Sequence, residues 1–298
     1  MTEAAQLIDA LNTTFGRHKG CRASHAKGFA VAGRFLPAPA EPAANIPLLH
    51  AEQPVVARFS IGGGKPGISD KSPTVRGIGL TIGSGPDLWT LALISAPVFF
   101  ASSAQQFVDF LAARVPDPKT GAPNPEKVKA FNIANPNTLP HQEYLKSTSP
   151  CRCYSTERFH SAHAYRFSVA DDPVAARVLL EPAAGRVGLT ENEMAELPDD
   201  FLGHALQTTL EARPASWTLK LVIANVADEL SDPTAPWTGE NQEISLGTIR
   251  IDKLDKSEDS LSRVFDPAHL PQMVGAPDDL VFPLRSNAYA VSKARRSG

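Results

Sequence analysis

The amino-acid sequence predicts an α+β protein in which helices surround an antiparallel sheet or barrel. From residue 54 to residue 100, β-branched and apolar segments are separated by glycine-rich turns, which is typical of antiparallel strands. Strand-like segments return between residues 163 and 180, and again between residues 218 and 251. Because these strands do not alternate regularly with helices, a doubly wound parallel sheet is disfavoured.

Local patterns predict the individual elements in order. Apolar residues from Leu7 to Phe15 recur at helical spacing, which predicts an opening amphipathic helix that ends near Gly16. Further helices are expected at residues 102–115, 125–134, 191–197, 199–211 and 283–296. Strands are expected at residues 55–61, 76–82, 88–95, 163–180 (two segments around a turn at 170–173), 218–227 and 244–251.

Composition and charge exclude several classes of protein. Of the 298 residues, 42% are hydrophobic and 20% are charged, which is too apolar for a disordered chain and too polar for a membrane protein. The formal net charge of −3 provides no basic field, so no nucleic-acid partner is expected. The longest apolar run, residues 88–101, contains a proline and is shorter than the roughly 20 residues of a membrane helix. No membrane insertion is therefore expected.

The start of the chain and its cysteines bear on its location. The first fifteen residues have no basic start followed by an apolar stretch, so no signal peptide is visible and a cytoplasmic location is expected. A trimmed mature chain in the periplasm would look the same. Cys21, Cys151 and Cys153 form no C-x-x-C pair, which argues against a disulfide framework or a zinc site.

A tyrosine near the C-terminus lies between two arginines at helical spacing. Arg285, Tyr289 and Arg296 are four and seven residues apart and therefore share one face of the last expected helix. A fixed cation one turn away favours the phenolate over the phenol, and phenolate oxygen is a hard ligand suited to ferric iron. The alternative is that the arginine and the tyrosine only stack on each other at the surface.

A histidine loop and a neighbouring strand carry the other candidate functional residues. His25 lies three residues after Arg22 and three before Gly28. Arg58 and Ser60 share one face of an expected strand, because side chains alternate along a strand. A charge and a hydroxyl on an inner face need partners. Taken alone, His25 also fits an ordinary core or surface histidine, and Arg58 an outward residue paired with a carboxylate.

The order of these motifs resembles that of the haem catalases. From about Thr14 to the last residue the chain contains, in turn, R-x-x-H-x-x-G, V-x-R-F-S, R-G-I-G, P-V-F-F, H-A-Y-R-F and R-x-x-x-Y. More closely, the chain resembles the small catalase-related peroxidases. The resemblance implies a catalase-like antiparallel β-barrel of about eight strands with surrounding helices. It also implies a single domain over residues 1–298 that binds haem b, without the wrapping segment and C-terminal helical domain of full-length catalases.

The resemblance assigns a role to residues of these motifs. It implies that His25 is the distal catalytic histidine, that Ser60 is its hydrogen-bonded partner, and that Tyr289 is the proximal iron ligand. The residues implied to support Tyr289 are Arg285, His163 and Asp279. Those implied to bind the haem propionates are Arg22, Arg58 and Arg296, and those implied to line the haem are Phe99, Phe100 and Phe107.

The sequence departs from the catalase pattern in the distal pocket. Ile94 stands where catalases have an asparagine, so a donor that would orient a second hydrogen peroxide is missing. Ser95 is the nearby polar residue that could substitute. Ser24, directly before the distal histidine, has a hydroxyl that could bond to peroxide or to His25.

The function implied by the resemblance is that of a haem peroxidase. It would reduce hydrogen peroxide or organic hydroperoxides with a small organic electron donor and would have weak catalase activity. A homo-oligomer, specifically a dimer, is expected. Two alternatives stay open: a fatty-acid hydroperoxide isomerase or lyase on the same haem, and a non-enzymatic haem-binding barrel. The presence of His25 and Ser60 argues against the non-enzymatic haem-binding barrel, because haem storage needs no distal base.

Overall fold

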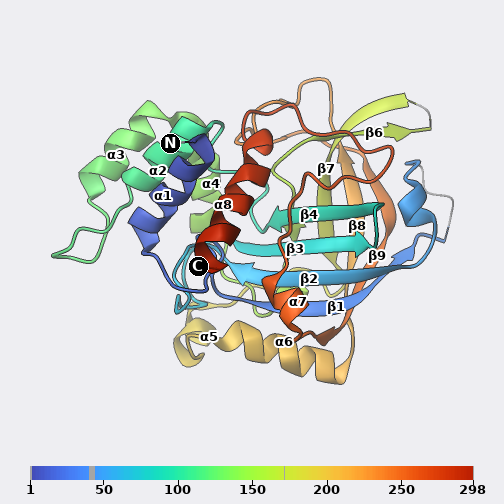
Figure 1. Ribbon diagram of the computed structural model, residues 1–298, viewed down its shortest axis with the longest axis horizontal. Coiled ribbons are helices and arrows are strands. Elements are labelled where there is room, and N and C mark those ends of the chain that lie inside the picture. The colour runs from blue at the N-terminus through green and yellow to red at the C-terminus, as the bar shows by residue number, and fades with distance from the viewer. Residues whose placement is uncertain (1, 40–43, 171, 298) are drawn as a thin grey trace.

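The computed structural model describes residues 2–39, 44–170 and 172–297, and within them an antiparallel β-barrel forms the centre of the protein (Figure 1). The strands of these residues are β1 (Gly28–Pro37), β2 (Gln53–Ile61), β3 (Arg76–Gly83), β4 (Leu88–Ile94), β5 (Phe159–His160), β6 (Tyr165–Val169), β7 (Asp172–Pro182), β8 (Ala215–Ile223) and β9 (Glu243–Leu254). They pair in the order β5-β4-β3-β2-β1-β9-β8-β7-β6, and β5 also pairs with β7. This second pairing closes eight strands into a barrel and leaves β6 outside it, which confirms the predicted fold.

The barrel encloses a core of aromatic and branched side chains. In β8, every second residue from Ala215 to Leu221 is buried, as expected for side chains that alternate across a sheet. Phe59 packs against Tyr154 with ring centroids 5.0 Å apart, and against Trp217 with centroids 5.5 Å apart. Burial of each such side chain contributes roughly 1.5–3 kcal/mol. The packed barrel wall therefore holds the side chains at its end in fixed positions.

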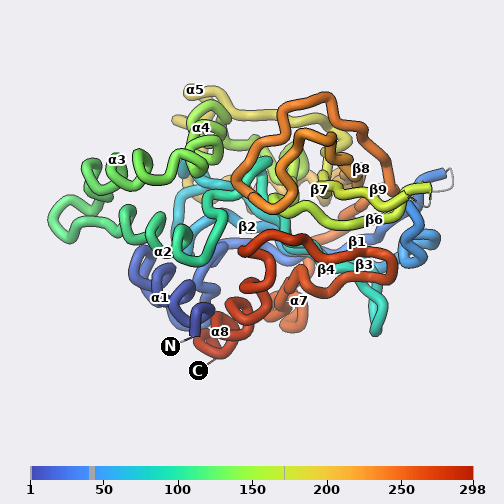
Figure 2. The backbone as a smooth tube through the Cα atoms, turned by 90° about the horizontal axis from the view of Figure 1, so that it is seen from above, coloured from blue at the N-terminus to red at the C-terminus, as the bar shows by residue number. Residues whose placement is uncertain are grey.

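Helices cover the outside of the barrel. In the described residues they are α1 (Glu3–Phe15), α2 (Ala104–Ala112), α3 (Pro125–Ala134), α4 (Leu139–Ser147), α5 (Glu191–Glu196), α6 (Phe201–Ala212), α7 (Glu258–Ser262) and α8 (Arg285–Ser297). Helix α1 packs against both α2 and α8, so the two ends of the chain lie side by side (Figure 2). An ion pair between Asp9 and Arg295, 2.6 Å long, joins α1 to α8. None of the helices in the described part of the chain is both long and apolar enough to cross a membrane.

Short-range interactions explain where the site-forming helices begin and end. The Thr2 hydroxyl accepts the Ala5 amide at 3.3 Å at the start of α1, and Gly16, with φ of 85°, ends this helix in a conformation that favours glycine. The Ser103 hydroxyl accepts the Gln106 amide at 3.2 Å and caps α2. The predicted helix boundaries in these two regions are thereby confirmed to within a few residues.

The sequence patterns missed β1, β5, α4 and α7. Strand β1 contains Gly28, Gly33 and alanines, which have weak strand propensity, so only pairing with β2 and β9 makes it a strand. Strand β5 has two residues and α7 has five, which is too short for a periodic signal. The apolar run at residues 88–101 is a strand only as far as Ile94. Asp171, in the predicted turn at 170–173, lies outside the described residues.

Candidate functional site

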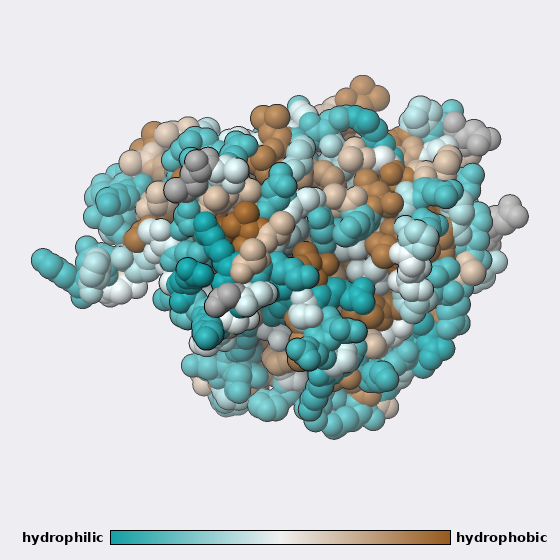
Figure 3. All heavy atoms as spheres, in the orientation of Figure 1, coloured by the Kyte–Doolittle hydropathy of each residue, from teal (hydrophilic) through white to brown (hydrophobic). Residues whose placement is uncertain are grey.

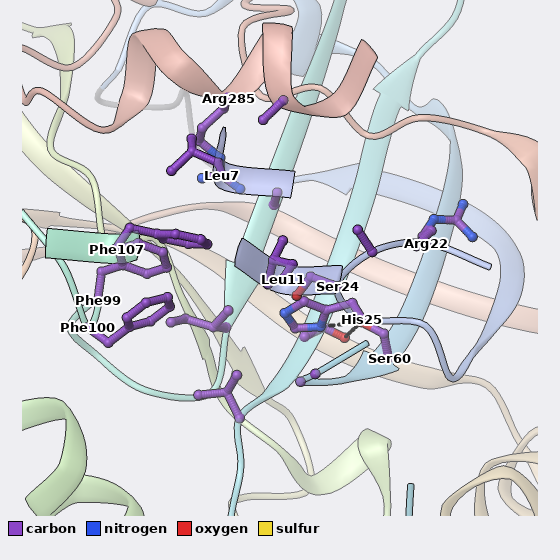
Figure 4. A pocket seen from close by; sticks show the side chains of 18 of the residues that line it. Leu7, Leu11, Arg22, Ser24, His25, Ser60, Phe99, Phe100, Phe107 and Arg285 are labelled. Carbon is purple, nitrogen blue, oxygen red and sulfur yellow. Dashed lines mark hydrogen bonds between the residues drawn. The ribbon is translucent and has the colours of Figure 1, made fainter. Parts of the chain in front are cut away.

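A cavity of about 670 Å³ lies at the end of the barrel where α1, α2 and α8 meet. Figure 4 shows the side chains that project into it, with His25 and Ser60 on one side and Phe99, Phe100 and Phe107 on another. In Figure 3, hydrophobic side chains (brown) are visible where α1 and α8 lie side by side, consistent with the apolar residues that both helices contribute to the lining. The predicted site residues that line the cavity are Arg22, His25, Arg58, Ser60, Phe99, Phe100, Phe107, His163, Arg285, Tyr289 and Arg296.

His25 and Ser60 form a hydrogen-bonded pair in this cavity. The distance between His25 Nδ1 and Ser60 Oγ is 2.9 Å (Figure 4). Ser60 lies on β2, and its hydroxyl also reaches the carbonyl of Gly77 on β3 at 3.4 Å. Because the hydroxyl donates to this carbonyl, it accepts a hydrogen from Nδ1, and Nε2 of His25 is left as the basic nitrogen.

A glycine on β3 makes room for this pair. A Cβ atom at Gly77 would lie 2.7 Å from His25 Cε1 and 3.0 Å from Ser60 Oγ. The first distance is shorter than carbon atoms tolerate, so any side chain here would push the imidazole out of position. Gly77 therefore determines the position of the His25 imidazole but takes no part in the chemistry itself.

Arg58 holds the loop that carries His25. Its guanidinium donates to the carbonyls of His25 and Ala26, at 2.9 and 3.0 Å. His25 has φ of 54°, a left-handed conformation that costs a residue other than glycine free energy and persists only when neighbouring groups impose it. A Cβ atom at Gly28 would lie 2.7 Å from Arg58 Cζ, so glycine is needed for the guanidinium to reach the loop. Arg58 and Gly28 together impose the conformation of His25.

The surroundings of His25 keep its imidazole neutral. Burial is the largest cause and lowers its pKa to about 4, and repulsion from Arg58, Arg285 and Arg22 acts in the same direction. At neutral pH the ring therefore carries no charge and can accept a proton.

Across the cavity, helix α8 presents a phenol next to a buried cation. Arg285 Nη2 donates to Tyr289 Oη at 2.7 Å, one helical turn away. Burial lowers the pKa of Arg285, but the Tyr289 and Tyr165 oxygens and the Asp279 carboxylate together more than offset this, and the pKa lies above its usual value. Arg285 therefore stays charged and stabilises negative charge on the phenol oxygen.

His163 and Asp279 form a second buried pair below α8. His163 Nδ1 lies 2.7 Å from Asp279 Oδ2, and Asp279 Oδ1 accepts the amides of Val281 and Phe282, both at 2.9 Å. Burial lowers the pKa of His163. Burial acts to raise the pKa of Asp279, but the hydrogen bonds that its carboxylate accepts from the His163 ring and from the two amides outweigh burial, so the pKa of Asp279 is lowered. The pair is therefore a neutral imidazole donating to a carboxylate. Arg285 bonds to Tyr289 and affects His163 by its charge alone.

Three arginines gather at one side of the cavity without a carboxylate partner in the described residues. Arg22 and Arg296 donate to backbone carbonyls of residues 261–263, and Arg58 to those of the His25 loop. Burial, followed by repulsion from Arg58 and Arg296, lowers the pKa of Arg22 to about 9. Burial also lowers the pKa of Arg58 to about 10 and that of Arg296. Buried and partly buried cations that repel one another in this way attract an anion.

The residues of the cavity fit a haem group. The uncompensated arginines match the two propionates, the phenylalanines match an apolar ring system, and a phenol beside a fixed cation matches the tyrosine ligation known for catalase haem. An imidazole on the other side has its basic nitrogen available. This chemistry accounts for arginines that have no carboxylate partner among the described residues.

The distal wall differs from the expectation at one residue. Ile94 lines the cavity, and so does Ser24, as the sequence suggested. The Ser95 hydroxyl instead accepts the Arg76 amide at 3.0 Å, and Ser95 does not line the cavity. Side chains alternate along the end of β4, so the residue after Ile94 points the other way. Ser24, and not Ser95, is therefore the polar neighbour of His25 in this wall.

Motif reasoning missed the far end of the cavity. Arg114, His141, Gln142 and Lys146 line it from the end of α2 and from α4. Helix α4 itself was not predicted, so three of these residues had no assigned place. The signal that was present is the four-residue spacing of Phe110 and Arg114, which places a cation over an aromatic ring.

Comparisons with known proteins agree with this geometry. The sequence profile of the family described as Catalase matches residues 2–298. A catalase-related peroxidase of Synechococcus elongatus is 30% identical over 98% of this chain and 88% of its own length. A catalase-related peroxidase of Mycolicibacterium paratuberculosis is 29% identical over 98% of this chain and 94% of its own length.

Solved structures show the same fold. A bacterial catalase superposes with a TM-score of 0.83 at 20% identity and covers 95% of this chain. Catalase A of Saccharomyces cerevisiae gives the same TM-score at 19% identity and also covers 95% of the chain. The chain spans 58% and 62% of the lengths of these two structures. The family is one of haem oxidoreductases that act on peroxide, and from its profile, its relatives and its fold, this chain belongs to the catalase family.

Proposed function

We propose that this protein is a haem b peroxidase. It reduces hydrogen peroxide or organic hydroperoxides with a small organic electron donor and has weak catalase activity. The observation that carries the proposal is the pairing of His25 and Ser60, 2.9 Å apart, in the same cavity as the Arg285–Tyr289 pair, 2.7 Å apart. The names of the two catalase-related peroxidases support it. We further propose that residues 1–298 form one such domain and that the protein is a cytoplasmic homodimer.

The residues that would hold haem follow from the geometry. Tyr289 would be the iron ligand, Arg22, Arg58 and Arg296 would bind the propionates, and Phe107 would pack on the ring. When bound, haem supplies the redox-active iron at which the O–O bond of a peroxide is reduced.

The side chains of the protein direct the protons of the reaction. Nε2 of neutral His25 accepts the proton of the hydroperoxide and returns it to the other peroxide oxygen, which leaves as water or alcohol. Ser60 keeps the ring in the tautomer that this transfer needs. Arg285 stays charged and donates a hydrogen bond to the Tyr289 oxygen, while His163 and Asp279 hold the segment that leads into α8.

The wall around His25 favours an organic donor over a second peroxide. Ile94 offers no hydrogen bond, so a second hydrogen peroxide would be poorly oriented. This is the basis for weak catalase activity.

An absorption spectrum of protein expressed with haem supply tests the proposal. We expect a stoichiometric ferric high-spin spectrum that shifts on addition of cyanide and is altered or lost in Tyr289→Phe. Tyr144→Phe, on α4 and outside the cavity lining, is the matched control and should keep the spectrum. No specific Soret band on haem titration, or an unchanged spectrum in Tyr289→Phe, would refute the proposal.

The pKa of His25 predicts the pH dependence of the reaction with peroxide. The folded pKa of about 4 lies below the ordinary value of 6.5, so the base is neutral at all pH values above about 4. Between pH 6.5 and 4 the unfolded chain binds more protons at this residue, so its contribution to stability falls as the pH falls. We expect kcat/KM for peroxide, measured in stopped-flow pH jumps, to stay level down to about pH 5 and to fall with a midpoint near 4. A midpoint near 6.5 would show that His25 is solvated like a surface histidine.

A further inference from the structure

The cavity continues past the phenylalanines to a second polar end. The rings form a continuous path, with centroids of Phe100 and Phe107 5.0 Å apart and those of Phe100 and Phe110 4.5 Å apart. At the end of this path Arg114 Cζ lies 3.5 Å from the centroid of Phe110. In Figure 4, Phe99, Phe100 and Phe107 lie on the opposite side of His25 from Arg22. Arg114 is therefore separate from the arginines assigned to the propionates.

Arg114 is a cation with only neutral partners among the described residues. Its guanidinium donates to the carbonyl of Phe110 at 3.0 Å, to Gln142 Oε1 at 3.0 Å and to Asn132 Oδ1 at 3.3 Å. A guanidinium has five N–H donors, so two remain for a ligand. Burial lowers the pKa of Arg114 to about 10. Lys146, exposed and also lining the cavity, has no ion pair in the described ranges.

Arg114 is held in place more firmly than a surface arginine. Gln142 Oε1 accepts from both Arg114 and Asn132 Nδ2, and Gln142 Nε2 donates back to Asn132 Oδ1 at 3.0 Å. These bonds connect the end of α2 with α3 and α4. The bond to Phe110 alone would suit a helix cap, but a cap needs neither the amide network nor a place in the cavity wall. A fixed guanidinium with free donors recognises a carboxylate with little loss of side-chain entropy.

We propose that this end of the cavity, formed by Phe100, Phe110, Arg114 and Gln142, binds an amphipathic organic anion. Arg114 receives the carboxylate and the phenylalanines receive the apolar body, so that the ligand extends toward His25. This inference rests on the proposed function for the reaction that the ligand undergoes, but not for its binding. The ligand is either an organic hydroperoxide that carries a carboxylate or an electron donor that carries one.

Binding of unreactive probes tests the site directly. Isothermal titration of the haem-loaded protein with sodium decanoate and with 1-decanol compares an anionic with a neutral ligand. We expect Arg114→Gln to weaken decanoate binding about tenfold and to change decanol binding less than about twofold, because only the anion loses a charge-assisted hydrogen bond. Arg152→Gln, an exposed arginine paired with Glu193, is the control and should change neither. Equal decanoate affinity in wild type and Arg114→Gln would overturn the inference.

A second variant covers loss of structure in Arg114→Gln. If that variant also loses decanol binding, Arg114→Lys, which keeps the charge, decides the question. Retained preference for decanoate over decanol in this variant supports the site, and loss of the preference while decanol still binds overturns it.

Two kinetic comparisons distinguish the hydroperoxide from the donor. In the first, a fatty-acid hydroperoxide and its methyl ester are compared with one neutral donor. In the second, a phenolic acid and its amide are compared as donors with hydrogen peroxide. In one of these comparisons, we expect Arg114→Gln to raise KM about tenfold for the anion and not for its neutral counterpart. That comparison identifies the ligand class. If the protein takes up no haem but still binds decanoate in a way that depends on Arg114, this inference holds and the proposed function is refuted.

Discussion

Replacing His25 with alanine is expected to lower peroxidase turnover by roughly 10²- to 10⁴-fold, the usual contribution of a positioned acid–base group. The reason is that no other imidazole in the described cavity lies beside Ser60 with its basic nitrogen available. His163 donates to Asp279, and His141 Nδ1 is 2.9 Å from the Val98 carbonyl. Steady-state kinetics with hydrogen peroxide and a phenolic donor give the measurement.

Two variants serve as controls for the His25 experiment. His50→Ala removes an exposed histidine outside the cavity lining and should leave turnover unchanged. Ser60→Ala keeps the base but removes its partner, and we expect an intermediate loss of about tenfold. Haem content, read from the Soret band, must stay equal in all variants. His25→Ala with full turnover and full haem content would exclude the assigned proton transfer.

Replacing Asp279 with alanine is expected to lower the free energy of unfolding by about 3–5 kcal/mol, because each buried donor that loses its acceptor costs about 1–3 kcal/mol. Asp279 and His163 are 2% and 3% exposed, and the carboxylate also accepts two backbone amides. The variant would leave an imidazole N–H and both amides buried without acceptors. Urea denaturation followed by circular dichroism measures the change.

The neighbouring aspartate provides a matched control for Asp279. Asp278 is 64% exposed and pairs with the exposed Arg166, so Asp278→Ala should cost less than about 1 kcal/mol. Asp279→Asn keeps an oxygen that can accept the two amides and should fall between the two alanine variants. Equal stability of Asp278→Ala and Asp279→Ala would show that the buried pair contributes little to the segment before α8.

Strand and helix patterns were sufficient to predict most of the barrel. The segments of β2, β3 and β4 are β-branched or apolar and are separated by glycine-rich turns, and α1 and α2 have apolar faces at helical spacing. These patterns involve only residues that are close in the sequence, so they can be recognised without tertiary information. Strand β1 and helix α4 lack such signals, and their structure depends on neighbours that only the fold brings close.

Sequence order also predicted which residues line the cavity, from Arg22 and His25 at one end of the chain to Tyr289 and Arg296 at the other. It did so through the resemblance of the motif order to that of the haem catalases, because each motif taken alone also fits an ordinary core or surface residue. The roles of these residues with haem stay predictions. What the sequence did not reveal is the orientation of individual side chains, such as that of Ser95 toward the Arg76 amide.

The sequence by itself determined an antiparallel sheet or barrel, because periodicity is a property of short segments, and the order of its motifs identified the family by resemblance to the catalases. The set of reactive side chains that this resemblance implies stays a prediction. Only the tertiary structure decided the space and contacts around them: the clearance that Gly77 gives His25, the bond that ties His163 to Asp279, and the second polar end at Arg114. The physical reason is that these features depend on distances between segments far apart in the chain. Such distances are set by packing of the whole barrel and its helices, and no local pattern encodes them.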